Sequence, residues 1–288
     1  MEQRERRDTL PARALRREAA CLLKAAGIEE ADADAGQLLF HAAGFDTASY
    51  LLHAEEPLPE PVRRRFMESV RRRADREPLQ YIIGEAPFYG RLFVVRPGVL
   101  IPRFDTEALC QQALDRLRGG ERVLDLCTGS GALAVALAAL RPGIRVAAGD
   151  ISPLAAALAR ENAARCGVSV DVRLGDLFAP FRGETFDMIV SNPPYIPAGQ
   201  LAGLQEEVRR EPALALDGGA DGLDFYRRII AEAPRYLAPG GWLLLEFGSD
   251  QAADVKALMA RDFEEISVFA DLDGHSRGAA GRRKPWAM

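Results

Sequence analysis

The segment Arg122–Leu140, RVLDLCTGSGALAVALAAL, decides the fold class of this chain. An apolar run typical of a buried strand leads into a glycine-rich turn, and leucines at helical spacing follow it. Gly129 and Gly131 have no Cβ, so the backbone of the turn can come close to a ligand. The turn reads G-x-G and not G-x-G-x-x-G, which makes a dinucleotide less favoured. Taken alone, it could also reflect tight packing of a helix on a strand.

Further apolar runs typical of strands follow this segment along the chain. The apolar runs, in chain order, are RVLDLC, IRVAAGD, VDVRL, FDMIVS and GWLLLEFG, and helical segments separate them. This alternation predicts right-handed βαβ units and a mainly parallel sheet, which is an α/β fold.

The first part of the chain has a helical pattern instead. A stripe of Leu15, Ala19, Leu22 and Ala26 ends at Gly27, GQLLFHAAG ends at Gly44, and Val62, Phe66 and Val70 follow Pro61. The stretch YIIGEAPFYGRLFVV, residues 81–95, predicts two strands around a turn that contains glycine and proline. We therefore expect a helical substrate-recognition domain over 1–78, a β-hairpin linker over 79–98 and the α/β domain over 99–288.

Arg64 and Arg71 are seven residues apart, so they share one face of the last of these helices. That face is either simply solvated or a docking surface for an acidic or RNA-bound partner.

Composition excludes several classes of protein. The net charge is −5, which is unlike the basic body of a protein that binds duplex nucleic acid, so no direct nucleic-acid partner is expected. No apolar run approaches the roughly 18 residues of a membrane helix, and MEQRERRDTL lacks the apolar core of a signal peptide. These features favour a cytoplasmic protein without a membrane partner.

The cysteines and histidines do not predict a metal site. Cys21, Cys110, Cys127 and Cys166 are far apart, and the three histidines form no ligand cluster. We expect reduced, mostly buried cysteines and no metal.

Acidic residues at strand ends suggest a ligand that contains adenosine. Asp150 ends the second strand, where a carboxylate can accept hydrogen bonds from both hydroxyls of a ribose. Ser152 and Pro153 are suited to begin the next helix. Asp176 and Leu177 follow the third strand and could hold an adenine. With the backbone of Cys127, Thr128, Gly129, Ser130 and Gly131, these residues are the candidate cofactor site.

The stretch VSNPPYIP, residues 190–197, supplies the candidate reacting groups. Pro193 and Pro194 fix φ and donate no hydrogen bond, so the loop is stiff and presents acceptors. The Asn192 side-chain oxygen and the Pro193 carbonyl can each accept a hydrogen from a planar –NH2 group, and Tyr195 can stack on the attached π system. An electrophile that fits beside an adenosine site is the methyl group of S-adenosylmethionine.

Taken together, these motifs resemble a class I S-adenosylmethionine-dependent methyltransferase. They are DLCTGSG, GD at 149–150, SNPPYIP and APGGWLLLEFG. More narrowly, PLQYIIGEAPFYG, VLIPRFDTE, EPALALDGGADGLDFYRRI and GHSRGAAGRR resemble the release factor glutamine methyltransferases. The resemblance covers nearly the whole chain. It implies a seven-stranded Rossmann-like sheet and methylation of the glutamine side-chain nitrogen (N5) in the Gly-Gly-Gln motif of peptide chain release factors.

The resemblance also implies site residues. It assigns cofactor contacts to Cys127–Gly131, Asp150, Leu177 and Asn192, and the substrate glutamine to Asn192–Tyr195. Two positions depart from the family pattern: Phe104 stands where a second proline is usual, and Cys127 stands where glycine is common. We therefore expect the loop that contains Phe104 to be less rigid than in the family. The Cys127 side chain should point away from the ligand.

Two other activities share the NPPY motif. One is methylation of a glutamine in a ribosomal protein, and the other is N-methylation of an adenine or guanine amino group, in which Tyr195 would stack on a flipped base. The helical N-terminal part favours release factors, and the acidic balance argues against nucleic acid. A non-catalytic adenosine-binding protein would not need the intact NPPY motif.

Overall fold

The computed structural model describes residues 10–271 and 273–285, so most of the charged N-terminal stretch lies outside the described residues. The chain divides into two compact units, which we describe separately. The first comprises residues up to Gly84 together with Glu206–Arg210, and the second comprises Glu85–Gln205 and the chain from Glu211 onward. Within the described residues, no helix is both long and apolar enough to cross a membrane.

The first unit is helical. Its helices are α2 (Ala12–Ala25), α3 (Ala31–Ala43), α4 (Thr47–His53), α5 (Glu60–Ala74) and α6 (Leu79–Ile83). Gly44 adopts a left-handed conformation directly after α3, as predicted, and Pro61 lies in the first turn of α5. Leu15, Leu23, Leu38 and Phe66 are fully buried in one core.

Two expectations for this part, on the α2 stripe and on the burial of the cysteines, were wrong in detail. The inward stripe of α2 continues through buried Leu23, whereas Leu22 is exposed, because the apolar face turns by one residue at that point. In the arginine-rich helix α5, Arg64 and Arg71 are both exposed, as either interpretation of their shared face requires, whereas Arg73 is buried. Cys21 is exposed, whereas Cys110 is buried.

The hairpin also begins later than the sequence suggested. Residues Tyr81–Ile83 belong to the short helix α6, which follows Pro78 and ends at Gly84 in a left-handed conformation. The strands are β1 (Glu85–Phe88) and β2 (Arg91–Val94), and the turn between them is Tyr89–Gly90. Both turn residues have positive φ, which is the geometry of a two-residue turn between twisted strands.

A seven-stranded sheet forms the centre of the second unit, in the order β5-β4-β3-β6-β7-β9-β8. Strands β3 to β7 are parallel, and β9 runs antiparallel to both of its neighbours. The bounds are β3 (Arg122–Leu126), β4 (Arg145–Asp150), β5 (Val170–Leu174), β6 (Phe186–Ser191), β7 (Leu237–Glu246), β8 (Phe263–Ala270) and β9 (Ser276–Arg283). The α/β class and the mainly parallel seven-stranded sheet are therefore confirmed.

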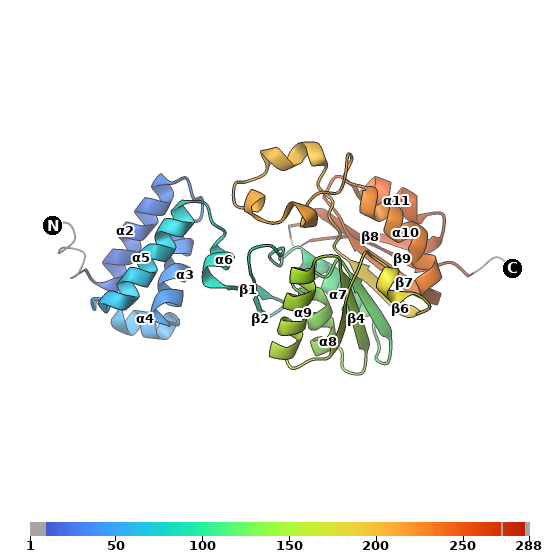
Figure 1. Ribbon diagram of the computed structural model, residues 1–288, viewed down its shortest axis with the longest axis horizontal. Coiled ribbons are helices and arrows are strands. Elements are labelled where there is room, and N and C mark those ends of the chain that lie inside the picture. The colour runs from blue at the N-terminus through green and yellow to red at the C-terminus, as the bar shows by residue number, and fades with distance from the viewer. Residues whose placement is uncertain (1–9, 272, 286–288) are drawn as a thin grey trace. The chain divides into compact units, whose positions relative to one another are not determined.

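Helices cover both faces of this sheet (Figure 1). One face packs against α7 (Thr106–Arg116), α8 (Ala132–Leu140) and α9 (Pro153–Arg165), and the other against α10 (Asp224–Tyr236) and α11 (Ala252–Met259). Alternate residues of β3 enter the two cores: Val123 faces α7–α9, and Leu124 faces α10 and α11. The chain continues from β3 to β4 and β5 on one side, and returns to the other side of β3 with β6. Such a reversal of strand order is where open α/β sheets bind ligands.

Short 3-10 turns complete the connections. They are η1 (Ala179–Phe181), η2 (Ala198–Gly203), η3 (Val208–Arg210) and η4 (Ala213–Ala215).

Candidate active site

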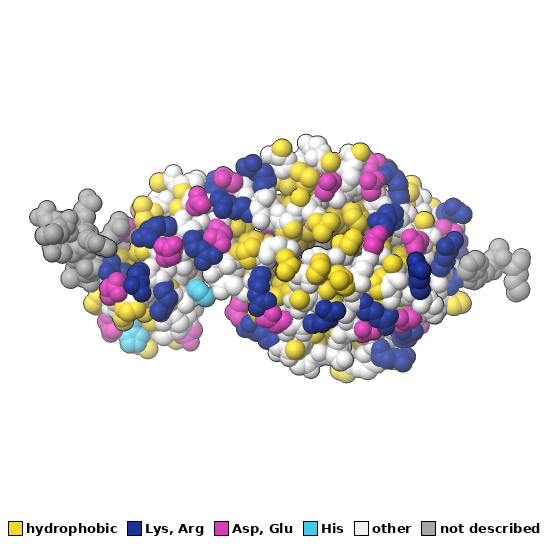
Figure 2. Space-filling model, viewed as in Figure 1, with side chains coloured by type: hydrophobic (Ala, Val, Ile, Leu, Met, Phe, Trp, Pro, Cys, Tyr) yellow, Lys and Arg dark blue, Asp and Glu magenta, His cyan; other side chains and the backbone are white. Residues whose placement is uncertain are grey.

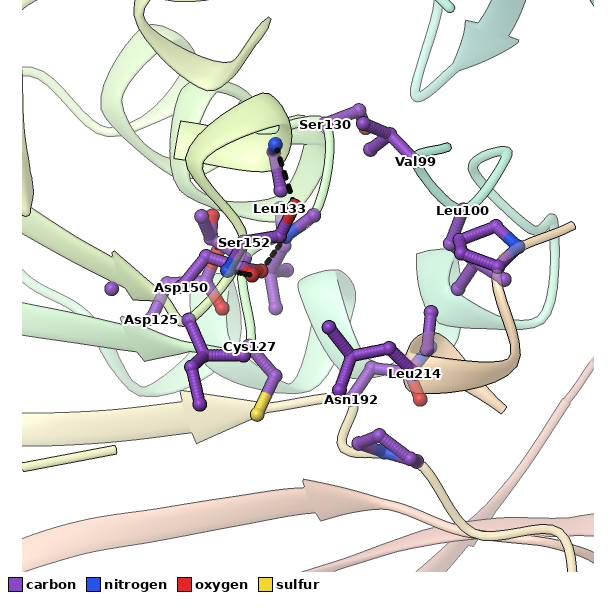
Figure 3. Close-up of a pocket in the computed structure, with 18 of the residues that line it drawn as sticks. Val99, Leu100, Asp125, Cys127, Ser130, Leu133, Asp150, Ser152, Asn192 and Leu214 are labelled. Atoms are coloured by element: carbon purple, nitrogen blue, oxygen red, sulfur yellow. Dashed lines mark hydrogen bonds between the residues drawn. The ribbon is translucent and has the colours of Figure 1, made fainter. Parts of the chain in front are cut away.

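A pocket of about 1200 Å³, its open mouth included, lies at the carboxyl ends of β3 to β6. Loops that follow adjacent strands line it (Figure 3), and Figure 2 shows hydrophobic side chains gathered across the middle of the larger unit. Most of the predicted site residues line the pocket: Cys127, Thr128, Gly129, Ser130, Asp150, Asp176, Leu177, Asn192 and Pro194. Gly131, Pro193 and Tyr195 are not among its lining residues.

The two glycines of the turn after β3 have different physical purposes. A Cβ on Gly129 would meet nothing within 4 Å, so this position leaves open space on the pocket side. A Cβ on Gly131 would lie 2.9 Å from the Cα of Ala159, so this glycine lets α9 pack closely against the start of α8. The buried Asn162 of α9 holds the turn by donating a hydrogen bond to the Ser130 carbonyl (2.9 Å).

Cys127 occupies a strained position in this turn. Its φ is +57°, a conformation that non-glycine residues adopt rarely. The side chain packs against the core formed with α10 and α11, and burial strongly raises the pKa of its thiol. The thiol is therefore protonated and packs as a small apolar group.

Asp150 is organised by backbone donors. Its two carboxylate oxygens accept hydrogen bonds from the Gly129 amide (2.9 Å) and the Ser152 amide (2.8 Å). Burial nevertheless raises the pKa of this carboxyl group, because water is largely excluded. Each carboxylate oxygen has a second lone pair. Asp150 can thus accept two further hydrogen bonds from a diol at the edge of the pocket.

Asp125 is a pocket residue that the sequence reasoning missed. It is almost completely buried in β3, lines the pocket and accepts a hydrogen bond from the Thr128 hydroxyl (2.6 Å). Burial raises the pKa of Asp125 to about 7, so a cationic ligand nearby would favour its ionised form. The sequence did contain a signal for this residue, because Asp125 is a charged residue inside an otherwise apolar strand.

The far end of the pocket combines an acid with an apolar surface. Leu177 is buried and has a φ of +45°, whereas Asp176 is half-exposed and forms an ion pair with Arg228 (2.6 Å). The pocket matches the parts of S-adenosylmethionine. Its carboxylates at Asp125 and Asp150 suit a cation and a ribose diol, and the apolar wall at Leu177, with open space at Gly129, suits a flat base. The donor and acceptor set of the pocket therefore fits this cofactor.

Asn192 begins the loop after β6, directly beside the glycine turn. Ser191 is the register partner of Leu126, and the Ser191 hydroxyl donates to the Leu126 carbonyl (2.7 Å), so the two loops leave the sheet together. The Asn192 Nδ2 donates to the Thr106 hydroxyl oxygen (3.1 Å). Figure 3 shows Asn192 near Leu214, away from Asp150 and Ser152.

The rest of the NPPY loop is fixed by contacts on the side away from the pocket. Pro193 and Pro194 are buried, and the Tyr195 carbonyl accepts a hydrogen bond from the Gln251 side chain (3.0 Å). The Tyr195 ring packs against the core with α10 and α11, and burial raises its pKa to about 12. The ring therefore stays a neutral phenol at ordinary pH.

Glu211 orders the segment that contains Phe104. One carboxylate oxygen of this buried residue accepts the Ile101 amide (3.0 Å), and the other accepts the Arg103 guanidinium. Phe104 itself is 67% exposed. The backbone before Phe104 is thus fixed by a buried carboxylate.

This sheet order, with a glycine turn and a strand-end acid at the point of reversal, defines a class I methyltransferase. Family models agree with both units: one described as "PrmC N-terminal domain" matches residues 14–84, and one described as "Methyltransferase small domain" matches residues 103–208. Curated relatives are similar over most of their length. A release factor glutamine methyltransferase from Geobacter sulfurreducens is 46% identical over 89% of this chain and 91% of its own. One from Cereibacter sphaeroides is 47% identical over 90% and 94%. The chain belongs to the release factor glutamine methyltransferase family.

Solved structures support the fold of the second unit. A methyltransferase from Pyrococcus furiosus is 20% identical and covers 69% of this chain and 91% of its own, with a TM-score of 0.53. A 16S rRNA N2 G1207 methyltransferase from T. Thermophilus, solved with AdoMet and guanosine, is also 20% identical and covers 69% of this chain and 50% of its own, with a TM-score of 0.51. These likenesses concern the fold alone.

Proposed function

We propose that this chain transfers a methyl group from S-adenosylmethionine to the N5 nitrogen of the glutamine in the Gly-Gly-Gln motif of peptide chain release factors. The observation that carries the proposal is the position of Asn192. Its loop leaves the sheet beside the glycine turn, and its side chain lines the same pocket as Asp150. An acceptor for an amide –NH2 group is therefore available next to a nucleoside-shaped site.

The chemistry needs an acceptor more than a base. An amide nitrogen is a poor nucleophile because resonance delocalises its lone pair, as the peptide rotation barrier of about 18–20 kcal/mol illustrates. The bound cofactor would supply an electrophilic methyl group. The Asn192 oxygen and the Pro193 carbonyl would hold the two amide hydrogens, which directs the nitrogen towards the pocket and favours the positive charge that develops there. The nitrogen loses a proton once it carries the methyl group.

Other residues would hold the cofactor. Asp150 would accept the ribose hydroxyls, Asp176 and Leu177 would contact the adenine, and the backbone of Cys127–Gly131 would line the remainder. Tyr195 would contact the substrate from behind the prolines. Its burial against the second core favours a fixed ring over a mobile one.

We also propose that the helical unit recognises the release factor. This unit has its own core, and it exposes Leu51 and Leu52 on α4 and Arg64 and Arg71 on α5. Exposed apolar and arginine side chains of this kind are typical of surfaces that bind a folded protein partner. A release factor as substrate also favours a cytoplasmic enzyme.

The test is methyl transfer from labelled S-adenosylmethionine to a purified release factor, beside its Gly-Gly-Gln→Gly-Gly-Glu variant. Label on the first factor and none on the second would support both acceptor and chemistry. Label on neither, with the cofactor bound, would contradict the proposal. Ribosomal proteins and then nucleic acid would be the next acceptors to test.

A further inference from the structure

Glu211 is a buried carboxylate that the proposed mechanism does not use. It is 5% exposed, and it directly precedes Pro212, which lines the pocket. One of its carboxylate oxygens accepts a hydrogen bond from the Ile101 amide (3.0 Å), and the other accepts one from the Arg103 guanidinium. Both of these partners also line the pocket. Glu211 therefore joins two segments of the pocket wall that are about a hundred residues apart in the chain.

A tight turn extends this restraint from Arg103 to Thr106. The Thr106 amide donates to the Arg103 carbonyl (3.2 Å), and α7 begins at Thr106. Asp105, within the turn, forms an ion pair with Arg277 of β9 (3.2 Å). Charged partners thus restrain the turn on both sides of Phe104, the position where the family usually has a proline.

Thr106 connects the turn to Asn192. Its side chain is buried and lines the pocket, and its hydroxyl oxygen accepts a hydrogen bond from Asn192 Nδ2 (3.1 Å). Figure 3 shows Asn192 on the same side of the pocket as Leu100 and Leu214, opposite Asp150. A series of hydrogen bonds therefore runs along this wall from Glu211, through the turn, to Asn192.

We propose that Glu211 is a positioning residue that places the Asn192 side chain in the pocket through the turn from Arg103 to Thr106. The inference rests on the proposed function, in which the Asn192 oxygen holds an amide hydrogen of the substrate. Glu211 is not itself among the residues that line the pocket, so its effect on the reaction must pass through this turn.

The alternative is that α7 alone places Thr106. Leu109 and Ala113 of this helix are fully buried against the sheet, so the helix is fixed without help from Glu211. In that case Glu211 would contribute to the stability of the fold, and its substitution would leave Asn192 where it is. The two possibilities differ in the rate of reaction and in the surroundings of the Asn192 side chain.

The first test is Glu211→Gln, which keeps the shape and an acceptor for the Ile101 amide but removes the charge that pairs with Arg103. We expect single-turnover methyl transfer at saturating cofactor and release factor to slow about 10- to 100-fold, as for a small misplacement of a reacting group. The control is Glu184→Gln, because Glu184 pairs with Arg122 (2.6 Å) at the end of β3 opposite to the pocket. This control should keep the rate within about twofold. Thermal unfolding checks that each variant folds, and Arg103→Met breaks the same ion pair if Glu211→Gln does not fold.

A double-mutant cycle separates positioning from stability. In an Asn192→Ala chain, adding Glu211→Gln should slow the reaction at most about twofold further, because the side chain that Glu211 places is gone. Thr106→Val should show the same dependence on Asn192, and Thr106→Ser, which keeps the hydroxyl, should restore most of the rate. Additive losses from Glu211→Gln and Asn192→Ala would overturn the proposal. A slow Thr106→Val beside an unaffected Glu211→Gln would also overturn it and would favour placement by α7 alone.

A third measurement does not depend on the acceptor. The Asn192 side-chain NH2 signal in the NMR spectrum of the cofactor-free full chain can be assigned by its loss in Asn192→Asp. This signal should move in Glu211→Gln and in Thr106→Val but not in Glu184→Gln. An unchanged signal in Glu211→Gln would overturn the positioning role, whatever the substrate is. A signal that moves, in a chain that does not methylate release factors, would support the positioning role and contradict the proposed function alone.

Discussion

At the scale of single residues, we expect substitution of Asn192 to affect catalysis more than cofactor binding. Asn192→Ala removes the acceptor at the mouth of the pocket but leaves Asp150 and the glycine turn intact. We expect kcat to fall about 10²- to 10³-fold, as for loss of one oriented hydrogen-bonding group in a transition state. The cofactor Kd, measured by calorimetry, should change little. Cofactor affinity that falls as far as kcat would contradict the assigned role.

Asp150 should behave in the opposite way. Asp150→Ala removes the carboxylate that accepts the Gly129 and Ser152 amides, so both the ribose acceptor and the shape of the turn are lost. We expect cofactor Kd to rise at least about tenfold, from loss of hydrogen bonds to a charged group. The control is Asp254→Ala, which changes an exposed acid on α11. A kcat effect at saturating cofactor that exceeds the Kd effect would argue against this role.

Several residues that line the pocket could be predicted because one local pattern determines each of them. Asp150 follows an apolar strand and precedes a serine cap, and Asn192 precedes two prolines. Asp125 was not predicted as a pocket residue because its surroundings come from neighbouring strands, and Glu211 was missed because its partners are about a hundred residues away. Their roles depend on burial, which spacing along the chain does not reveal.

At the scale of elements, the apolar strands β3 to β7 were predicted, whereas the antiparallel pair β8 and β9 was not, and β9 shows the reason most clearly. Its residues Ser276–Arg283 are mostly glycine, alanine and arginine, a composition that gives no strand signal. Small residues are needed there because a Cβ on Gly278 would lie 2.2 Å from the ring of Phe269. The hairpin was misplaced for a related reason: Pro78 and Gly84 turn the apolar run Tyr81–Ile83 into a helix.

The packing of α8 on α9 depends on Gly131. Gly131→Ala places a Cβ 2.9 Å from Ala159, at a φ of +81°. We expect a loss of about 2–4 kcal/mol in the free energy of unfolding, from overpacking and strain together. Gly143→Ala is the matched control, because its φ is +91° but its nearest neighbour would be 3.7 Å away. Equal losses in denaturant unfolding would show that strain alone, without the contact to α9, is responsible.

The exposed arginines of α5 test the recognition hypothesis. Arg64→Glu combined with Arg71→Glu reverses two charges on one helix face. We expect KM for the release factor to rise about tenfold, from loss of electrostatic complementarity, with kcat and cofactor Kd nearly unchanged. Arg182→Glu, an exposed arginine of the methyltransferase unit, is the control. An unchanged KM would indicate that this face is only solvated.

At the scale of the whole molecule, each of the two units is stabilised by hydrophobic cores of its own. One core lies wholly within the helical unit, and two others cover the faces of the sheet. A change that stabilises or destabilises one unit should therefore act first on the unfolding of that unit. Arg73 and the cofactor offer one such change for each.

Arg73 is the main polar contact inside the helical core. It donates to buried Asp34 (2.7 Å) and to Glu207 (2.9 Å), the latter in the segment that joins this unit from much later in the chain. Arg73→Met leaves Asp34 buried without its guanidinium partner, which should cost about 3–5 kcal/mol. Arg71→Met on the same helix removes only an exposed pair with Glu68 and should cost at most about 1 kcal/mol.

Calorimetric unfolding of the full chain should then resolve two transitions. Arg73→Met should lower the transition of the helical unit, while S-adenosylmethionine at 100 times its Kd should raise only the other, by about 2.7 kcal/mol. The physical reason is linkage: a ligand stabilises only the unit whose unfolding destroys its site. If the cofactor raised both transitions equally in the wild type and in Arg73→Met, the units would unfold as one. The helical unit would then report on cofactor binding as well as on the integrity of its own core.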